Sequence, residues 1–146
     1  MTLHVVCPHC HATNRVPPER LDAAPVCGRC KAALFVQHPV ELDGQTFARQ
    51  VEQSDIPVLV DFWAPWCAPC RAMAPQYEQA AARLEPHFRV AKLDTEANPA
   101  IAQRFGIRSI PSLVLFRGGH EIARRAGASD AASIERWARA ALAGQA

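Results

Sequence analysis

The stretch 57–70, PVLVDFWAPWCAPC, decides how this chain folds. Its first eight residues form a nearly continuous apolar run, which is typical of a central strand covered on both faces. Beyond Cys67, the apolar residues recur at the spacing of a helix: Met73, Tyr77, Ala80, Ala81 and Leu84. The stretch therefore predicts a buried strand that turns directly into a helix, with two cysteines at the junction.

The chain downstream alternates between strand and helix patterns. The expected elements are a strand over 88–93, a short helix from Asn98-Pro99 to Gly106, a strand over 112–116, a hairpin turn at Gly118-Gly119, a strand near 121–124, and a last helix capped by Ser129-Asp130. Pro75 lies inside the first helix and should kink it, because proline cannot donate the helical hydrogen bond. This order predicts an α/β fold, with a mixed sheet and helices on both of its faces.

Length and charge limit the classes of partner. The chain has 146 residues, enough for one ordinary domain and an appendage, and a formal net charge of +2 that is too weak to indicate nucleic acid as a ligand. Apolar stretches are too short for a membrane helix, and the first residues lack the pattern of a secretion signal. We therefore expect a cytoplasmic protein that binds neither nucleic acid nor a membrane.

All six cysteines form Cys-x-x-Cys pairs, and the first two pairs differ from the third. Sixteen residues separate Cys10 from Cys27, which is the spacing of a zinc site with four cysteine ligands. The four expected ligands are Cys7, Cys10, Cys27 and Cys30. Two disulfides are the alternative, and a reducing compartment disfavours them. We expect one structural Zn²⁺ per chain, held by four sulfurs with no open position.

The N-terminal segment 1–36 needs such a metal, because it has little apolar material and a chain of under about 40 residues rarely folds without a staple. We expect it to form a small zinc-ribbon-like domain, joined through a linker at 37–40 to a domain spanning 37–146. The motif Cys7-Pro-His-Cys10-His11 also matches a haem attachment signature. Haem would need export and would leave Cys27 and Cys30 unexplained. A nucleic-acid-binding ribbon is a further alternative, which four scattered cations do not favour.

The third pair, Cys67 and Cys70, has the arrangement of a redox site. The two residues lie at i and i+3 of a helix start, so their sulfurs share one side of the first turn. The helix N-terminus favours a thiolate at Cys67 and should lower its pKa from about 8.5 toward 7. Cys70 lies one turn further in, on the buried side. We expect an exposed, activated sulfur at Cys67 and a shielded, resolving sulfur at Cys70.

Asp61 is the unusual residue of the strand, because ionising a carboxyl within an apolar run is costly. Burial should raise its pKa toward neutrality, which makes Asp61 a candidate acceptor for the proton of the resolving thiol. The alternative is a structural aspartate satisfied by backbone or water.

With these residues in place, the chain resembles the thioredoxin family. Trp66-Cys67-Ala68-Pro69-Cys70 looks like its active site, and later landmarks match in order: Lys92, Ile110-Pro111 and Gly127. The additional N-terminal cysteine pairs are similar to those of the zinc-binding bacterial thioredoxin 2 type. The resemblance implies a sheet flanked by four helices, with Pro111 in cis opposite the cysteines.

The resemblance also implies roles for individual residues. Cys67 would be the nucleophile and Cys70 the resolving cysteine, while Asp61 would move protons with Lys92 nearby. The residues on which substrate chains would dock are Trp66, Ile110, Pro111 and Gly127. One departure is Ala68, where the family usually has glycine; it restricts the turn, so the balance between thiol and disulfide could differ from the family's.

We therefore expect a protein-disulfide reductase acting as a monomer on disulfide-containing proteins. The family implies that a flavin thioredoxin reductase using NADPH returns the oxidised pair to the dithiol, and no cofactor other than zinc is expected. The alternative function is a redox-sensing binding module, in which oxidation releases zinc and exposes apolar surface for a client.

Overall fold

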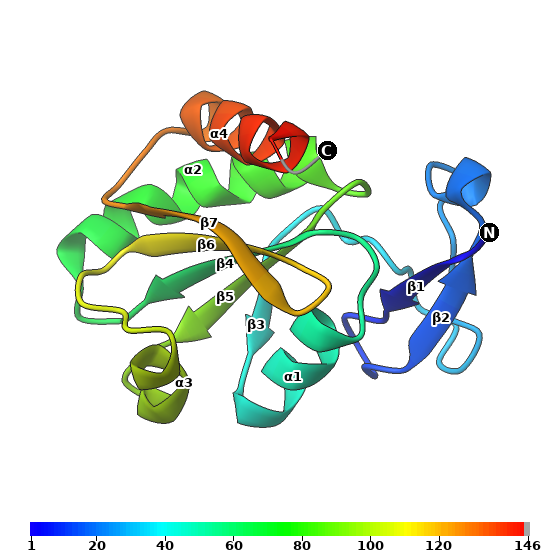
Figure 1. Ribbon diagram of the computed structural model, residues 1–146, viewed down its shortest axis with the longest axis horizontal. Helices are drawn as coiled ribbons and strands as arrows, with labels where there is room; N and C mark the ends of the chain where they lie inside the picture. Colours follow the sequence, from blue (N-terminus) through cyan, green and yellow to red (C-terminus); the bar gives the residue numbers. More distant parts are fainter. Residues whose placement is uncertain (145–146) are drawn as a thin grey trace.

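A five-stranded mixed sheet forms the centre of the fold, in the order β3-β5-β4-β6-β7 (Figure 1). The computed structural model describes residues 1–144. β3 and β4 both run parallel to β5, whereas β6 is antiparallel to β4 and to β7. The strands are β3 (Val40–Leu42), β4 (Val58–Trp63), β5 (Arg89–Asp94), β6 (Ser112–Arg117) and β7 (His120–Ala126).

Four helices cover the two faces of this sheet, with α2 and α4 on one face and α1 and α3 on the other (Figure 1). Side chains alternate along β4, so Leu59 packs with α2 and α4 while Val60 and Phe62 pack toward α1. The helices are α1 (Gly44–Glu52), α2 (Ala68–Leu84), α3 (Pro99–Arg104) and α4 (Ala131–Ala143). The predicted fold, a mixed sheet flanked by four helices, is confirmed.

The individual elements follow the sequence patterns closely, with some differences. α2 continues through Pro75 without a break, and Asp130 caps α4 by accepting from the amide of Ser133. Asn98 precedes α3 as expected, but its side chain makes no capping bond and donates instead to the carbonyl of Asp94. β3 and α1, which the sequence analysis did not identify, complete the sheet and its second face.

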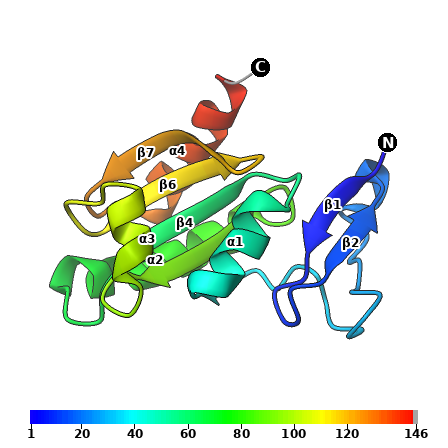
Figure 2. The same ribbon diagram turned by 60° about the horizontal axis from the view of Figure 1, so that its bottom comes forward.

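The N-terminal part is a two-stranded antiparallel ribbon of β1 (Leu3–Val6) and β2 (Thr13–Val16), followed by the short 3-10 helix η1 (Pro18–Arg20). Figure 2 shows this ribbon beside the main sheet. It contacts the ends where β4 and β5 begin: the amide of Asp55, just before β4, donates to the carbonyl of His4 at 2.8 Å. α2 starts at the opposite end of the sheet (Figure 1), so the ribbon lies away from the third cysteine pair.

Arg89, the first residue of β5, joins the two parts. One nitrogen of its buried guanidinium, Nη2, donates to the carbonyls of Val6 and Leu34 in the ribbon, at 3.0 and 2.6 Å. The guanidinium carbon also lies 4.9 Å from the centre of the Phe35 ring. The cation is therefore satisfied by groups of the ribbon, which packs directly on the sheet domain.

Glu85 and Gln50 of the sheet domain also make hydrogen bonds to the N-terminal part or to its junction with the sheet domain. The carboxylate of Glu85 accepts from the amides of Val36 and Gln37, at 3.1 and 2.9 Å. The buried amide of Gln50 in α1 donates to the carbonyl of Cys7 at 3.0 Å. The residues around the boundary expected between 36 and 37 are thus tied down by hydrogen bonds, and the boundary itself stays a prediction.

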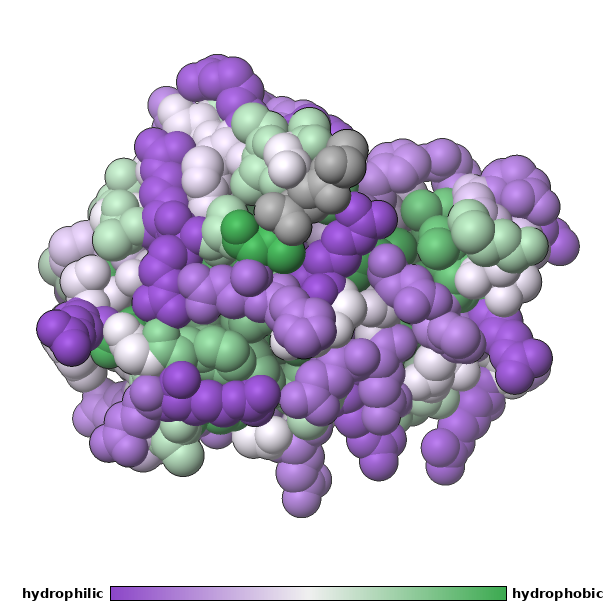
Figure 3. Space-filling view, in the orientation of Figure 1, coloured by the Kyte–Doolittle hydropathy of each residue, from purple (hydrophilic) through white to green (hydrophobic). Residues whose placement is uncertain are grey.

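The surface seen in Figure 3 is largely hydrophilic, with smaller hydrophobic areas. Among the described residues, the large apolar side chains that remain exposed are Met1, Val26 and Trp66. None of the helices in residues 1–144 is both long and apolar enough to cross a membrane. Trp66 is exposed immediately next to Cys67, so an accessible apolar surface lies beside the third cysteine pair.

Candidate active site and cysteine cluster

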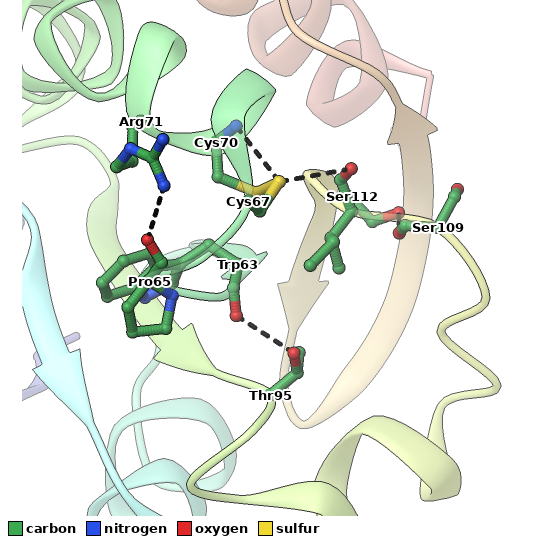
Figure 4. The surroundings of a disulfide bond; sticks show 9 residues. Trp63, Pro65, Cys67, Cys70, Arg71, Thr95, Ser109 and Ser112 are labelled. Atoms are coloured by element: carbon green, nitrogen blue, oxygen red, sulfur yellow. Dashed lines mark hydrogen bonds between the residues drawn. A yellow bond between two sulfur atoms is a disulfide. The ribbon is translucent and has the colours of Figure 1, made fainter.

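Cys67 is the N-cap of α2, and a disulfide joins it to Cys70 in the first turn (Figure 4). The sulfur of Cys67 accepts a hydrogen bond from the amide of Cys70 at 3.2 Å. A sulfur at this position faces the unpaired amides of the helix start, which stabilise negative charge. The local geometry therefore favours Cys67 as the thiolate when the pair is reduced.

The two cysteines differ in position more than in exposure. In this disulfide form Cys67 is 4% exposed and Cys70 3% exposed, so the expected contrast between an exposed and a shielded residue is not present. The contrast lies in the surroundings: Cys67 stands at the helix tip, whereas Cys70 belongs to the buried side of α2 together with Met73 and Tyr77. A substrate disulfide must therefore approach the sulfur of Cys67 from the N-terminal end of α2.

Asp61 lies near the end of β4, is almost fully buried, and has one carboxylate oxygen, Oδ1, with no hydrogen-bond partner among residues 1–144. Burial raises its pKa to about 7; Lys92 opposes this effect and Glu41 adds to it. Because Oδ1 accepts no hydrogen bond that would stabilise the charged form, the carboxyl can exchange a proton near neutral pH.

Lys92 lies directly across from Asp61 on the parallel neighbour β5. Its ammonium nitrogen lies 4.1 Å from the centre of the Trp63 ring, in a cation–π contact. The structure thus brings Asp61 and Lys92 together as cross-strand neighbours. Trp63, the last residue of β4, contacts Lys92 just before the turn that leads to α2.

The loop before β6 faces the disulfide. The Ile110–Pro111 peptide bond is cis, as the resemblance implied, and the carbonyl oxygen of Ile110 lies 3.8 Å from the sulfur of Cys67. Gly127 has φ +93°, a conformation that glycine adopts readily, and its amide donates to the carbonyl of Pro111 at 2.9 Å. Trp66, which precedes Cys67 in the chain, is 65% exposed.

Further hydrogen bonds brace the turn between β4 and α2 (Figure 4). Arg71 donates from Nη1 to the carbonyl of Pro65 at 2.9 Å, and the hydroxyl of Thr95 donates to the carbonyl of Trp63 at 3.1 Å. The sequence analysis did not identify either residue, because a polar side chain that donates to a backbone carbonyl of another element leaves no periodic or motif pattern in the sequence.

The first two cysteine pairs form one cluster in two matching turns. The four sulfurs of Cys7, Cys10, Cys27 and Cys30 all lie within 4.8 Å of one another. In each pair the amides of the second and third residues after the first cysteine point to its sulfur, at 3.3 and 3.5 Å for Cys7 and at 3.4 and 3.5 Å for Cys27. This is the donor set and the arrangement that a tetrahedral Zn²⁺ requires.

The thiols of this cluster need a cation to ionise together. The amide of Cys30 and further hydrogen bonds lower the pKa of Cys27 to about 6. The pKa of Cys30, although lowered by the amide of Ala32, is raised on balance to about 11 by burial and by the other three thiols. A divalent metal ion removes this conflict, so the residues fit zinc. The nearby His11 has its Nδ1 3.2 Å from Nε2 of Gln50, and the four cysteine sulfurs already supply a complete tetrahedral ligand set.

Comparison with known proteins gives matches to both parts of the chain. A family model described as Thioredoxin matches residues 38–140, and a zinc-ribbon model described as Thioredoxin 2, N-terminal, matches residues 6–32. Thioredoxin C-3 of Corynebacterium nephridii is 46% identical over 133 residues, which cover 91% of this chain and 91% of that protein. The chloroplastic M-type thioredoxin of Chlamydomonas reinhardtii is 38% identical over 82% of this chain and 87% of its own.

A third relative, Thioredoxin 1 of Nostoc sp., is 47% identical over 88 residues, which cover 60% of this chain and 82% of its own length. These relatives favour disulfide exchange over the alternative of a redox-sensing binding module. Their similarity agrees with the disulfide at the tip of α2 and with the four-cysteine cluster that suggests zinc binding. The chain therefore belongs to the thioredoxin family, in the form that carries an N-terminal zinc ribbon, and it is a thiol–disulfide oxidoreductase.

Proposed function

We propose that this thioredoxin reduces protein disulfides in the bacterial cytoplasm through an attack by Cys67 and a resolution by Cys70. The thiolate of Cys67 attacks one sulfur of the substrate disulfide, forms a mixed disulfide and releases the other sulfur as a thiolate. Cys70 then attacks the sulfur of Cys67, so the substrate leaves fully reduced and the Cys67–Cys70 disulfide forms. Two electrons pass from the enzyme dithiol to the substrate.

One observation carries this assignment: the sulfur of Cys67 caps α2 and accepts from the amide of Cys70. The same amide and the helix start would stabilise Cys67 as a thiolate, and they would also stabilise it as the leaving group when Cys70 attacks. Cys70, which lies further along α2, would not receive this stabilisation. The order of attack follows from this difference.

Asp61 would accept the proton of Cys70 before the second attack, assisted by Lys92. A carboxyl with a pKa of about 7 is half ionised at neutral pH, so it can take a proton in one direction of the exchange and return it in the other. The ammonium of Lys92, its cross-strand neighbour, would favour the ionised form that accepts the proton.

Substrate chains would dock on Trp66, Ile110, Pro111 and Gly127. Trp66 offers an exposed apolar surface beside the nucleophile, and Ile110 packs against Cys67. An extended peptide could pair with backbone groups of the loop before β6, in the manner of an added strand. The oxidised pair would be reduced by a flavin thioredoxin reductase that draws on NADPH, and the protein would act as a monomer.

One structural Zn²⁺ per chain would hold the ribbon, residues 1–36, in its folded form. The ribbon would be a domain of its own that packs on the domain of residues 37–146. Gln50 binds the carbonyl of the ligand residue Cys7, and Arg89 binds the carbonyl of the adjacent Val6. A metal that fixes these carbonyls would support the docking without taking part in the redox step.

The test is trapping of the mixed disulfide. Cys70→Ser should accumulate a covalent adduct with a disulfide substrate such as insulin, detected by mass spectrometry, whereas Cys67→Ser should form none and should lose insulin reduction. Equal adduct formation by both variants, or adducts on Cys70 alone, would overturn the assigned order of attack.

A further inference from the structure

Three charged residues form one row across the three parallel strands of the sheet. Glu41 of β3 lies directly across from Lys92 of β5, and Lys92 lies directly across from Asp61 of β4. Neighbouring strands are about 4.8 Å apart, so the backbones of Glu41 and Asp61 are about 10 Å apart with Lys92 between them. In this row, two acidic residues therefore flank one lysine.

All three side chains of the row are on the face that α2 covers. The residues on either side of Glu41, Val40 and Leu42, belong to the core of the opposite face, and so do the neighbours of Lys92 and of Asp61. Because side chains alternate along a strand, the members of the row are on the α2 side.

Burial changes step by step along this row. Asp61 is buried, Lys92 is half-buried, and Glu41 is exposed. β3 is the edge strand of the sheet, so the row ends at solvent on that side. The outer carboxyl can be altered without opening the core, which separates its electrostatic effect from packing.

We propose that Glu41 is a positioning residue of the exchange reaction, which sets how readily Asp61 takes up a proton by sharing the charge of Lys92. This inference rests on the proposed role of Asp61 as the proton acceptor for Cys70. With Glu41 ionised, the ammonium is partly neutralised and favours the ionised form of Asp61 less. Asp61 then remains protonated up to a higher pH, and is poised to return a proton as well as to accept one.

The other groups around the row support this assignment. From α2, the hydroxyl of Tyr77 donates to the carbonyl of Ala91, next to Lys92, and β6 places the apolar Leu113 opposite Asp61. Lys92 and Glu41 are therefore the charged groups that act on Asp61, Lys92 lowering its pKa and Glu41 raising it.

The outer carboxyl itself responds to the same neighbours. Partial desolvation of its carboxyl by the neighbouring protein raises the pKa of Glu41, the nearby Lys92 lowers it, and Asp94 on the same strand as Lys92 raises it. Glu41 thus interacts with the charges of β5 from the edge strand, which is the interaction that the proposal requires.

The experiment replaces Glu41 and measures the titration of Asp61. In the oxidised protein, carboxyl ¹³C NMR follows the protonation of Asp61 directly. In a second measurement, the reduced protein is mixed with a disulfide substrate, and the rate at which the mixed disulfide is resolved is recorded against pH. We expect Glu41→Gln to move both midpoints to lower pH, by about 0.3 to 1 pH unit for a charge about 10 Å away. Glu41→Lys should move them further in the same direction, with the rate plateau at high pH and the KM unchanged.

Glu19→Gln in η1 is the matched control, because it removes one surface carboxylate far from the row. Coincident midpoints for Glu41→Gln and Glu19→Gln would overturn the inference. Asp61→Asn separates the two proposals: if its rate profile keeps the same midpoint, Asp61 is not the proton acceptor, and the NMR titration alone then decides on Glu41. If Asp61→Asn loses the midpoint and Glu41→Gln leaves it in place, only the role of Glu41 fails.

Discussion

The guanidinium of Arg89 and the carboxylate of Glu85 form a buried ion pair, 3.1 Å from Nη1 to Oε2, where the ribbon meets the sheet domain. Each residue also binds the ribbon or its junction with the sheet domain: Arg89 through the carbonyls of Val6 and Leu34, and Glu85 through the amides of Val36 and Gln37. A buried pair is retained at low cost only where its remaining hydrogen-bonding groups are satisfied. The ribbon supplies those groups, so the two parts depend on each other.

Removing the cation of this pair should strongly destabilise the protein. Arg89→Ala leaves the Glu85 carboxylate buried without its partner, which typically costs about 3–5 kcal/mol. The free energy of unfolding in urea measures this loss. Arg139→Ala is the matched control, since Arg139 pairs with Glu135 at the same spacing of four residues and the same 3.1 Å, but on the surface. The control should lose no more than about 1 kcal/mol. Equal losses in the two variants would show that the buried pair does not join the parts.

The stability of the protein should report the raised pKa of Asp61. An unfolded aspartate loses its proton near pH 4, whereas Asp61 in the folded oxidised protein loses it near pH 7. The unfolded state is therefore favoured progressively as the pH rises from 4 to 7, by up to about 4 kcal/mol. Asp61→Asn should match the wild type at pH 4 and exceed it by a few kcal/mol at pH 8 in urea unfolding. An equal difference at both pH values would rule out this titration.

Metal removal should affect stability more than catalysis. The cluster lies at the ribbon end, away from the tip of α2, so the dithiol chemistry does not pass through it (Figure 1). Cys27→Ser should lose bound zinc and lower the thermal midpoint, while the reduced, folded variant still reduces insulin. Metal analysis, with Co²⁺ absorption as a check on tetrahedral sulfur ligation, measures the first effect. Complete loss of turnover in a folded Cys27→Ser protein would contradict this division of roles.

Trp66 should contribute to substrate affinity and little to the chemical step. Burying an exposed tryptophan against a docked chain is worth about 1–2 kcal/mol, so Trp66→Ala should raise the KM for a protein disulfide about 5- to 30-fold with kcat nearly unchanged. Val26→Ala, which trims the 58% exposed side chain on the ribbon, is the control and should leave both constants unaltered. A loss confined to kcat in Trp66→Ala would place this residue in the reaction rather than in docking.

The sequence predicted structure best where residues with chemical roles lie within or next to a buried apolar segment. The apolar run with Asp61 inside it predicted β4 and a perturbed carboxyl, and the cysteine spacings separated a metal cluster from a redox pair. β3 and α1 were missed, although α1 carries signals: Asp43 caps it together with Thr46, and Phe47 and Val51 lie four residues apart on its buried side. These elements are short, and β3 alternates only once, so their patterns are weak compared with the run before Cys67.

The sequence by itself determined the order of elements, the two kinds of cysteine chemistry and the carboxyl beside the redox pair, because spacing and polarity along the chain specify these locally. Tertiary structure alone decided that Glu41, Lys92 and Asp61 share one row, and that Arg89 and Glu85 hold the ribbon. The physical reason is that strand pairing and domain docking bring together groups up to 83 positions apart, as in the bond from Arg89 to Val6. At such distances neither periodicity nor motif spacing carries information about contact.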